Sequence, residues 1–257
     1  MKEVSLRIIN KGFIYSQDGP GNRLVYHLGG CNMKCPWCAN PEGMNPEGIY
    51  LTEKNGTRHL SYKIVKVEDM IEEICSAIPV MIDGGGVTFS GGEPTLQFEG
   101  LIYILEQLQK KGIHTAIETN GSSPRLKELI PLLNLLIIDF KHPFSEVHKK
   151  YTGVGNEIIE KNIREISDMG VPMWIRTPLI NGVNTSSKCM EKFIQIYTGG
   201  MNLSNVSFEL LYYHELGAQK WEKCGLEYKM EHAFVTKCIM RMWEDAYKNA
   251  GLKLIHT

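Results

Sequence analysis

Three cysteines stand close together near the N-terminus, in the run GCNMKCPWC, with the spacing C-x3-C-x2-C. They are Cys31, Cys35 and Cys38. A structural zinc site normally has four ligands in two pairs, and the chain has no second cysteine pair. Three thiolates on one short loop can each bind one iron of a 4Fe-4S cubane and leave the fourth iron open to another ligand. The spacing predicts such a cluster, with a structural zinc or plain ferredoxin site as the alternative.

Short apolar segments that alternate with helical patterns predict the framework that positions this loop. Six of them are typical of strands, at 24–30, 86–92, 114–120, 135–140, 171–179 and 206–213. Apolar residues spaced i, i+3, i+4 and i+7 predict helices over 67–78 and 98–108 and around 159–166, and a last helix is predicted over 232–249. This alternation predicts an α/β fold with a parallel sheet and right-handed crossovers. Six units fit a (β/α)6 partial TIM barrel.

Polar residues follow each predicted strand, at the end where parallel barrels carry their active sites. In chain order they are the cysteine loop, Gly91-Gly92-Glu93, Glu118-Thr119-Asn120, Asp139 with Lys141, Arg176 and His214. Glycine lets the backbone approach a ligand closely, and residues two apart at a strand end emerge on the same side. The sequence therefore predicts one site built from all six strand ends. Ordinary turns and a solvated Asp139–Lys141 pair are the alternatives.

Composition limits the class of protein. The chain has 257 residues, 43% of them hydrophobic, which suits a single domain over 1–257. Its net charge of -1 indicates neither nucleic acid nor an anionic membrane as a partner. The N-terminus lacks the apolar core of a signal peptide, and no long uncharged apolar stretch occurs. We therefore expect a cytoplasmic protein whose seven cysteines are kept reduced.

Seven segments together resemble the radical S-adenosylmethionine (SAM) superfamily, and within it the activating enzymes of glycyl-radical enzymes. The matching segments are DGPGNR, CNMKCPWCANPE, GGGVTFSGGEP, ETNG, DFK, IRTPLINGVN and YHELGAQKWEKCG. The resemblance implies one 4Fe-4S cluster that cleaves SAM reductively to a 5′-deoxyadenosyl radical, which removes a hydrogen from a glycine of a partner enzyme. It also implies an electron donor such as flavodoxin or ferredoxin, and we expect a monomer.

The resemblance also implies residue roles, which concern SAM, a cation and the partner. SAM would contact Trp37, Gly91, Gly92, Glu93, Glu118, Asp139, Lys141, Arg176 and His214. Arg176 would hold the SAM carboxylate or a substrate backbone. Glu118, Thr119 and Asp139 would form a monovalent-cation site, but related enzymes have a shorter Asp at position 118, which leaves the cation open. Asp18 would contact the partner's glycine loop, and a plain turn is its alternative.

The insert after the cysteine loop and the four remaining cysteines bear on how closely the chain follows this family. The insert at about 40–62, where many activating enzymes carry further clusters, contains no cysteine, which moves the resemblance toward the pyruvate formate-lyase type. Cys75, Cys189, Cys224 and Cys238 are scattered and are predicted to be structural.

Two alternative functions are a radical SAM enzyme acting on a small molecule, of the queuosine-precursor type, and a non-catalytic iron-sulfur sensor. DGPGNR, DFK and YHELGAQKWE disfavour the first, and the candidate SAM ligands on five other strand ends disfavour the second.

Overall fold

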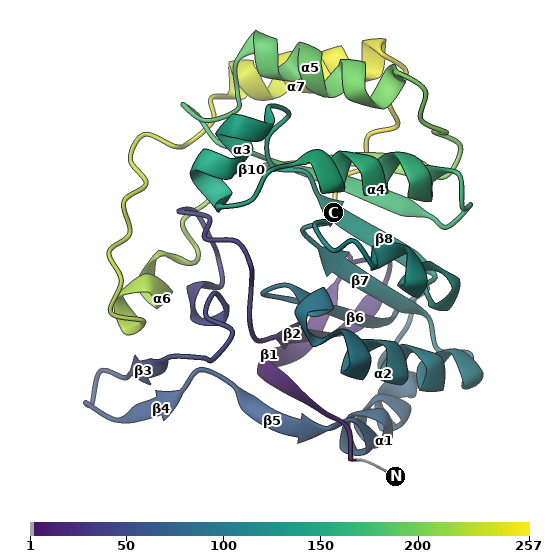
Figure 1. Cartoon of the computed structure of the whole chain (residues 1–257), viewed down its shortest axis with the longest axis vertical. Coiled ribbons are helices and arrows are strands. Elements are labelled where there is room, and N and C mark those ends of the chain that lie inside the picture. The colour runs from purple at the N-terminus through teal and green to yellow at the C-terminus, as the bar shows by residue number, and fades with distance from the viewer. Residues whose placement is uncertain (1–2) are drawn as a thin grey trace.

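The computed structural model describes residues 3–257, and its framework is an eight-stranded sheet flanked by helices (Figure 1). The strand order is β10-β9-β8-β7-β6-β2-β1-β5. Six neighbouring strands are parallel: β2 (Asn22–Leu28), β6 (Gly86–Gly91), β7 (Thr115–Thr119), β8 (Leu135–Asp139), β9 (Met173–Leu179) and β10 (Val206–Tyr212). They coincide with the six predicted strands to within a few residues. Because β10 and β5 end the sheet without pairing to each other, the barrel is open, and the predicted (β/α)6 partial barrel is confirmed.

Helices cover the outer face of the parallel strands. They are α1 (Val67–Ala77), α2 (Phe98–Lys110), α4 (Glu157–Ser167), α5 (Ser187–Thr198) and α7 (Lys237–Asn249), and their buried apolar residues form one core with the outward residues of the strands. The predicted start of the last helix at 232 is wrong. The helix begins at Lys237 because the Thr236 side chain caps it by accepting from the backbone N–H of Ile239. The short helices α3 (Ser145–Thr152) and α6 (Ala218–Lys223) and the longer α5 were not predicted.

Antiparallel strands extend the sheet on one side. β1 (Ser5–Tyr15) pairs with β2 and with β5 (Lys63–Lys66), and both pairings are antiparallel. The insert at 40–62 contains the 3-10 turn η1 (Pro41–Gly43) and a hairpin of β3 (Tyr50–Thr52) and β4 (Arg58–Leu60). Further 3-10 turns are η2 (Ile78–Val80), η3 (Pro94–Gln97) and η4 (Leu126–Leu132). The insert thus leads from the cysteine loop to the antiparallel edge of the sheet.

The barrel interior changes from apolar to polar toward the carboxyl ends of the strands. Ala116, Leu135 and Ile137 form a small buried cluster with Trp174. Residues two positions further along a strand point to the same side. Glu118, Asp139 and Arg176 therefore follow Ala116, Ile137 and Trp174 on the inner face, one layer closer to the mouth. Among the helices of residues 3–257, none has the length and apolarity needed to cross a membrane.

Candidate active site

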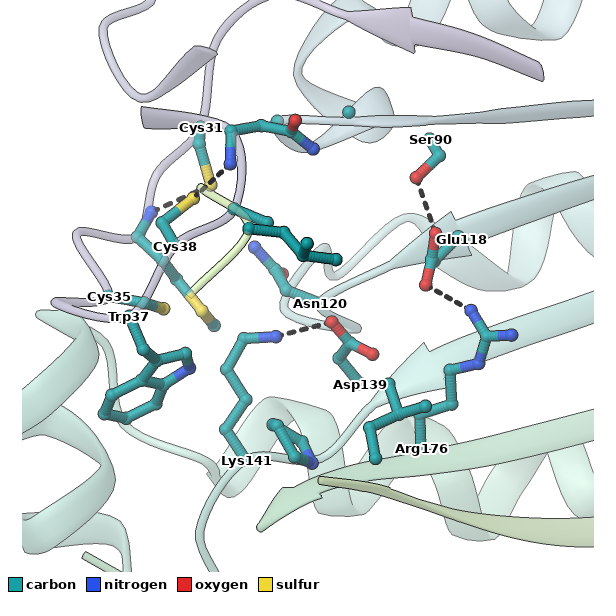
Figure 2. Close-up of a pocket in the computed structure, with 18 of the residues that line it drawn as sticks. Cys31, Cys35, Trp37, Cys38, Ser90, Glu118, Asn120, Asp139, Lys141 and Arg176 are labelled. Atoms are coloured by element: carbon teal, nitrogen blue, oxygen red, sulfur yellow. Dashed lines mark hydrogen bonds and ion pairs between the residues drawn. The ribbon is translucent and has the colours of Figure 1, made fainter. Parts of the chain in front are cut away.

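A cavity of about 500 Å³ opens at the carboxyl ends of the parallel strands, within the size range of small-molecule sites. Figure 2 shows the three cysteines and Trp37 at one end and Glu118 and Arg176 at the other. The predicted site residues that line it are Asp18, Cys31, Cys35, Trp37, Cys38, Gly91, Gly92, Glu118, Thr119, Asp139, Lys141, Arg176 and His214. Glu93 is the predicted site residue outside this lining. Tertiary structure thus brings thirteen of the fourteen together.

The cysteine loop presents a soft donor set that fits an iron-sulfur cluster. Two backbone N–H groups already point at thiol sulfurs, from Met33 to Cys31 Sγ at 3.3 Å and from Asn40 to Cys38 Sγ at 3.4 Å. Such bonds to sulfur are among the features that set a cluster's reduction potential. In residues 3–257 no three His, Cys, Asp or Glu side chains converge on a point for a single ion, whereas in a cubane each thiolate binds its own iron.

Burial controls the protonation of these thiols before a cluster is inserted. It raises the pKa of Cys31 and of Cys35 to about 12. Burial also raises the pKa of Cys38, although the N–H of Asn40 opposes this shift. Because iron binds the thiolate form, insertion of a cluster would release the thiol protons.

Helix α6 anchors the outer side of the cysteine loop. The indole N–H of Trp221 donates to the carbonyl of Cys38 at 3.0 Å, and Lys220 Nζ lies 2.7 Å from Asn40 Oδ1 and 2.9 Å from Glu42 Oε1. A side chain at Gly217 would lie 2.6 Å from the Ala39 Cα, so only glycine allows this approach. The YHELGAQKWEKCG segment therefore supports the loop, a role that the sequence analysis missed.

Gly91 and Gly92 are required by the packing of the cysteine loop. Gly91 has φ +112°, and a Cβ there would lie 2.4 Å from the Leu28 nitrogen. A Cβ on Gly92 would lie 2.1 Å from the Gly30 carbonyl oxygen. The backbone N–H of Gly92 donates to Leu28 O at 2.8 Å, which ties this segment to the end of β2. The two glycines therefore bring the cavity wall and the cysteine loop into contact.

The Glu93 carboxylate lies behind the cavity wall, so of the two acceptors expected for the SAM ammonium in this segment, carboxylate and backbone carbonyl, the carboxylate is turned away from the cavity. It is fully buried and accepts from Thr119 Oγ1 and the Asn120 N–H, both at 2.7 Å, and from the N–H and hydroxyl of Thr95. Burial raises the pKa of Glu93 in spite of these donors. Glu93 therefore joins the ends of two strands, and the acceptors that this segment can offer a ligand are backbone carbonyls.

Asp139 and Lys141 form a pair inside the cavity. Lys141 Nζ lies 2.6 Å from Asp139 Oδ2 (Figure 2), and only 9% of Lys141 is exposed. Burial by itself would lower the pKa of Lys141, but the Asp139 carboxylate outweighs burial and raises it. Asp139 Oδ1 is buried and has no hydrogen-bond partner among the described residues. The pair thus offers a ligand both a cation with free N–H donors and an unsatisfied acceptor, which suits a zwitterion with hydroxyl groups.

Arg176 is held by three carboxylates at the other end of the cavity. Its Nη1 lies 2.6 Å from Glu118 Oε1 and 3.6 Å from Asp18 Oδ1, and its Nε lies 2.7 Å from Glu209 Oε2. Its Nη2 donates to the Gln17 carbonyl. These contacts hold the guanidinium at the cavity wall, and its role toward the SAM carboxylate or a substrate backbone stays a prediction.

The side chains of the predicted cation site already contact one another and neighbouring groups. One Glu118 oxygen accepts from Arg176 and the other accepts from Ser90 Oγ at 2.6 Å (Figure 2). The Thr119 hydroxyl donates to Glu93, and Asp139 Oδ2 pairs with Lys141. The guanidinium supplies positive charge at Glu118, and the monovalent cation stays a prediction.

Asp18 reaches the same cavity from the turn before β2. Its carbonyl accepts from Thr88 Oγ1 at 2.7 Å, and Gly19 and Gly21 adopt φ +126° and +65°. Burial and the neighbouring Glu118 carboxylate raise the pKa of Asp18 to about 7, although Arg176 opposes this shift. The Arg176 Nη1 is 1.0 Å closer to Glu118 Oε1 (2.6 Å) than to Asp18 Oδ1 (3.6 Å).

Replacing Asp18 by Asn is expected to make the protein more stable at pH 8 and to leave its stability below about pH 4 nearly unchanged. Between about pH 4 and pH 7 the folded state retains a proton on Asp18 that the unfolded chain has lost, so this carboxyl lowers the stability of the wild type as pH rises. Since the shift spans about 3 pKa units and each unit corresponds to about 1.4 kcal/mol, we expect a gain of up to about 4 kcal/mol at pH 8 in urea unfolding. Asp245→Asn, on the exposed face of α7, is the matched control. Equal effects of both variants at pH 8 would contradict this account.

The sequence analysis assigned no role to several residues in and around the cavity. Asn120, which was placed at a strand end, lines the cavity, and so does Ser90, which the rule that strand ends carry the site could have found. Glu209 lies in the middle of β10, and only its alternation with Ser207 signalled an inward side chain. His27 lines the cavity and has a buried Nδ1 without a partner among the described residues, and no sequence signal pointed to it.

Comparison with known proteins places this geometry in context. The family model described as Radical SAM superfamily matches residues 25–193. The chain is 34% identical over 225 residues to a pyruvate formate-lyase-activating enzyme of Staphylococcus epidermidis, covering 84% of each chain. It is 33% identical over 251 residues to the enzyme of that name from Streptococcus mutans, covering 94% of this chain and 88% of that one.

Solved structures also resemble this chain. A domain of a pyruvate-formate lyase-activating enzyme from Bacteroides vulgatus superposes with a TM-score of 0.56 at 32% identity, over 66% of this chain and 98% of that chain. A radical SAM methyltransferase from Sphaerobacter thermophilus has a TM-score of 0.64 at 14% identity, over 95% of this chain and 67% of that one. At this low identity the second similarity concerns the fold alone.

Proposed function

Since the chain belongs to the radical SAM superfamily, and within it to the family of the pyruvate formate-lyase-activating enzymes, we propose that it activates a glycyl-radical enzyme. The chemistry of the family uses one 4Fe-4S cluster and SAM. When bound, the cluster supplies one electron that cleaves SAM to methionine and a 5′-deoxyadenosyl radical, which removes a hydrogen atom from a glycine of the partner.

One observation carries this proposal. Three thiols and the Asp139–Lys141 pair, which come from strands and loops more than 100 residues apart, line the same cavity. The protein's contribution is to bind, orient and keep water away from the reacting groups. Hydrogen-atom abstraction needs no general base, which agrees with a site that pairs its carboxylates with Arg176 and Lys141. The small-molecule and sensor alternatives are not favoured, because the curated relatives are activating enzymes.

The cysteine loop would hold the cluster at one end of the cavity. Cys31, Cys35 and Cys38 are the proposed iron ligands, and the N–H groups of Met33 and Asn40 would stabilise two of the thiolates. Trp221 and Lys220 on α6 would hold the loop in position through their bonds to the Cys38 carbonyl and Asn40.

SAM would lie between the cysteines and the polar strand ends. Lys141 would donate to its carboxylate, and Asp139 Oδ1 would accept from a ribose hydroxyl. Backbone carbonyls near Gly91 and Gly92 would accept from its ammonium group. Trp37 would stack on the adenine, with His214 as a further contact.

The partner is proposed to approach the end of the cavity that Asp18 lines. Asp18 is part of the lining and 15% of its side chain is exposed, so a glycine loop could reach it without displacing the SAM contacts. The cytoplasmic location, the monomeric state, the single-domain organisation and the identity of the electron donor stay predictions.

Anaerobic reconstitution tests the proposed function. The protein should take up about four iron and four sulfide per chain, since one cubane has four of each. With SAM and dithionite it should form 5′-deoxyadenosine. With a candidate partner added, such as a glycyl-radical enzyme encoded by a neighbouring open reading frame, a glycyl radical should appear by electron paramagnetic resonance. The control omits the reductant.

Other outcomes would contradict parts of the proposal. Roughly eight iron atoms per chain would show a second cluster. A loaded cluster without 5′-deoxyadenosine would favour the sensor alternative. Formation of 5′-deoxyadenosine without a radical on any glycyl-radical enzyme would favour a small-molecule substrate.

A further inference from the structure

The cysteine loop has an outer side that carries positive charge. Lys34, just before the second cysteine, is exposed, and its backbone N–H donates to the Thr152 carbonyl at 2.9 Å. This bond places the loop against the last turn of α3, where Lys149 and Lys150 are also exposed. We call Lys34, Lys149 and Lys150 the lysine patch.

The three lysines of the patch have no ion-pair partner among the described residues, whereas Lys220 and Lys223 on nearby α6 pair with Glu42 and Glu53. Basic residues in the last turn of a helix interact favourably with the helix dipole. That effect accounts for Lys149 and Lys150 but not for Lys34, which lies on a loop and adds to their charge.

Two aromatic rings connect the lysine patch with the cysteine end of the cavity. The rings of Trp37 and Tyr151 have centroids 5.8 Å apart, and Lys150 Nζ lies 5.4 Å from the Tyr151 centroid. Trp37 directly precedes Cys38 and lines the cavity. The half-buried side chains of Tyr151 and Trp37 therefore connect Lys150 with the cysteine loop.

The proposed function requires one electron for each SAM cleaved, and the described residues outside the cysteine loop offer no second group of three cysteines to hold a cluster. The remaining cysteines lie on separate elements: Cys75 in α1, Cys189 in α5, Cys224 after α6 and Cys238 in α7. The electron must come from another molecule. The donor loses one electron, the cluster gains it, and the electron then breaks the bond between the SAM sulfur and its 5′ carbon.

We propose that the lysine patch is the docking surface for a small acidic one-electron carrier protein, which delivers its electron to the cluster beside Trp37. Complementary charge speeds encounter between proteins by about 10- to 1000-fold at low salt. The inference rests on the proposed function, but it concerns delivery of the electron and not its use. Binding and cluster reduction can therefore be measured without SAM.

Reversing two charges of the patch tests the proposal. In Lys149→Glu/Lys150→Glu, loaded with its cluster, reduction by a flavodoxin hydroquinone should slow at least about tenfold at low ionic strength, followed by stopped-flow absorbance of the cluster. The dissociation constant for flavodoxin, measured by calorimetry, should rise by a similar factor. The difference should shrink above about 0.15 M salt, where screening acts over about 8 Å. Reduction by dithionite should be unchanged.

The chain contains a matched control in Lys110 and Lys111. They are also adjacent, exposed lysines at the end of a helix, without an ion pair among the described residues, but α2 ends near the amino ends of the strands. Lys110→Glu/Lys111→Glu should therefore be reduced by flavodoxin like the wild type. Lys149→Gln/Lys150→Gln provides a milder version of the test if the Glu variant folds poorly.

The alternatives have distinct results. Equal slowing in the α2 and α3 variants, or no slowing in either, would overturn the proposal. Normal reduction by flavodoxin combined with loss of glycyl radical under dithionite would overturn it as well and assign the patch to the glycyl-radical partner. A failure of the proposed function would appear separately, as a reduced cluster that does not cleave SAM.

Discussion

Arg176→Met is expected to lower the free energy of unfolding by about 3 to 5 kcal/mol at pH 8, because it leaves buried carboxylates without their cation. Arg176 is 3% exposed, and its guanidinium lies within 2.7 Å of oxygens of Glu118 and Glu209. Without it, burial would raise the pKa of Glu118 in the folded state above that in the unfolded chain. The folded state would then bind more protons, so the loss should be largest at high pH and should shrink as pH falls toward 5. Urea unfolding of the cluster-free protein measures both quantities.

Arg164→Met is the matched control for this change. Arg164 pairs with Glu160 on the surface of α4, where both side chains are about one-third exposed, and such a pair contributes less than about 1 kcal/mol. Arg176→Lys should recover part of the stability, since it restores the charge but not the fork of donors. If Arg176→Met and Arg164→Met lost equal stability at pH 8, the three carboxylates would not depend on the guanidinium.

Lys141→Met is expected to weaken SAM binding by about 10- to 150-fold, the equivalent of one charge-assisted hydrogen bond of about 1.5 to 3 kcal/mol. Lys141 is buried beside Asp139 and uses one of its donors on that carboxylate, which leaves N–H groups for a ligand. Methionine keeps most of the length of the side chain and removes the charge. Anaerobic equilibrium binding of SAM to the cluster-loaded protein measures the loss.

The iron content of Lys141→Met shows whether weaker SAM binding comes from the lost lysine or from a lost cluster. Lys141 is not a thiolate ligand, so the variant should still hold about four iron atoms per chain. Lys188→Met is the matched control, since Lys188 lies near Phe144 outside the cavity and should bind SAM normally. Unchanged SAM affinity in Lys141→Met, with a full cluster, would remove this residue from the binding site.

Much of the site could be predicted because it follows from local rules. The three cysteines are within eight residues of one another, so their spacing alone indicated a shared metal group. Short apolar segments between helical patterns located the six parallel strands, and the geometry of parallel barrels then assigned their polar ends to one cavity. Both inferences need only short stretches of chain, which explains why thirteen of the predicted site residues line the cavity.

Contacts across the barrel could not be predicted in this way. Glu93 was expected in the cavity, but its carboxylate turns toward Thr119 and Asn120 because the end of β7 lies beside it. Arg176 was expected to hold the SAM carboxylate or a substrate backbone, and no sequence signal indicated that it pairs with Glu118 and Glu209, on strands 58 and 33 residues away. The support of the cysteine loop by Trp221 spans 183 residues.

The sequence by itself thus determined which residue types gather at the mouth of the barrel, because strand periodicity and motif spacing are properties of neighbouring residues. Only the tertiary structure decided which of those groups pair with each other and which stay free for a ligand. The thiols of Cys31, Cys35 and Cys38 and the Asp139–Lys141 pair have atoms available to a ligand, whereas Glu93 and Arg176 are paired with groups of the protein. The physical reason is that hydrogen bonds and ion pairs depend on separations of a few ångströms between atoms far apart in the chain.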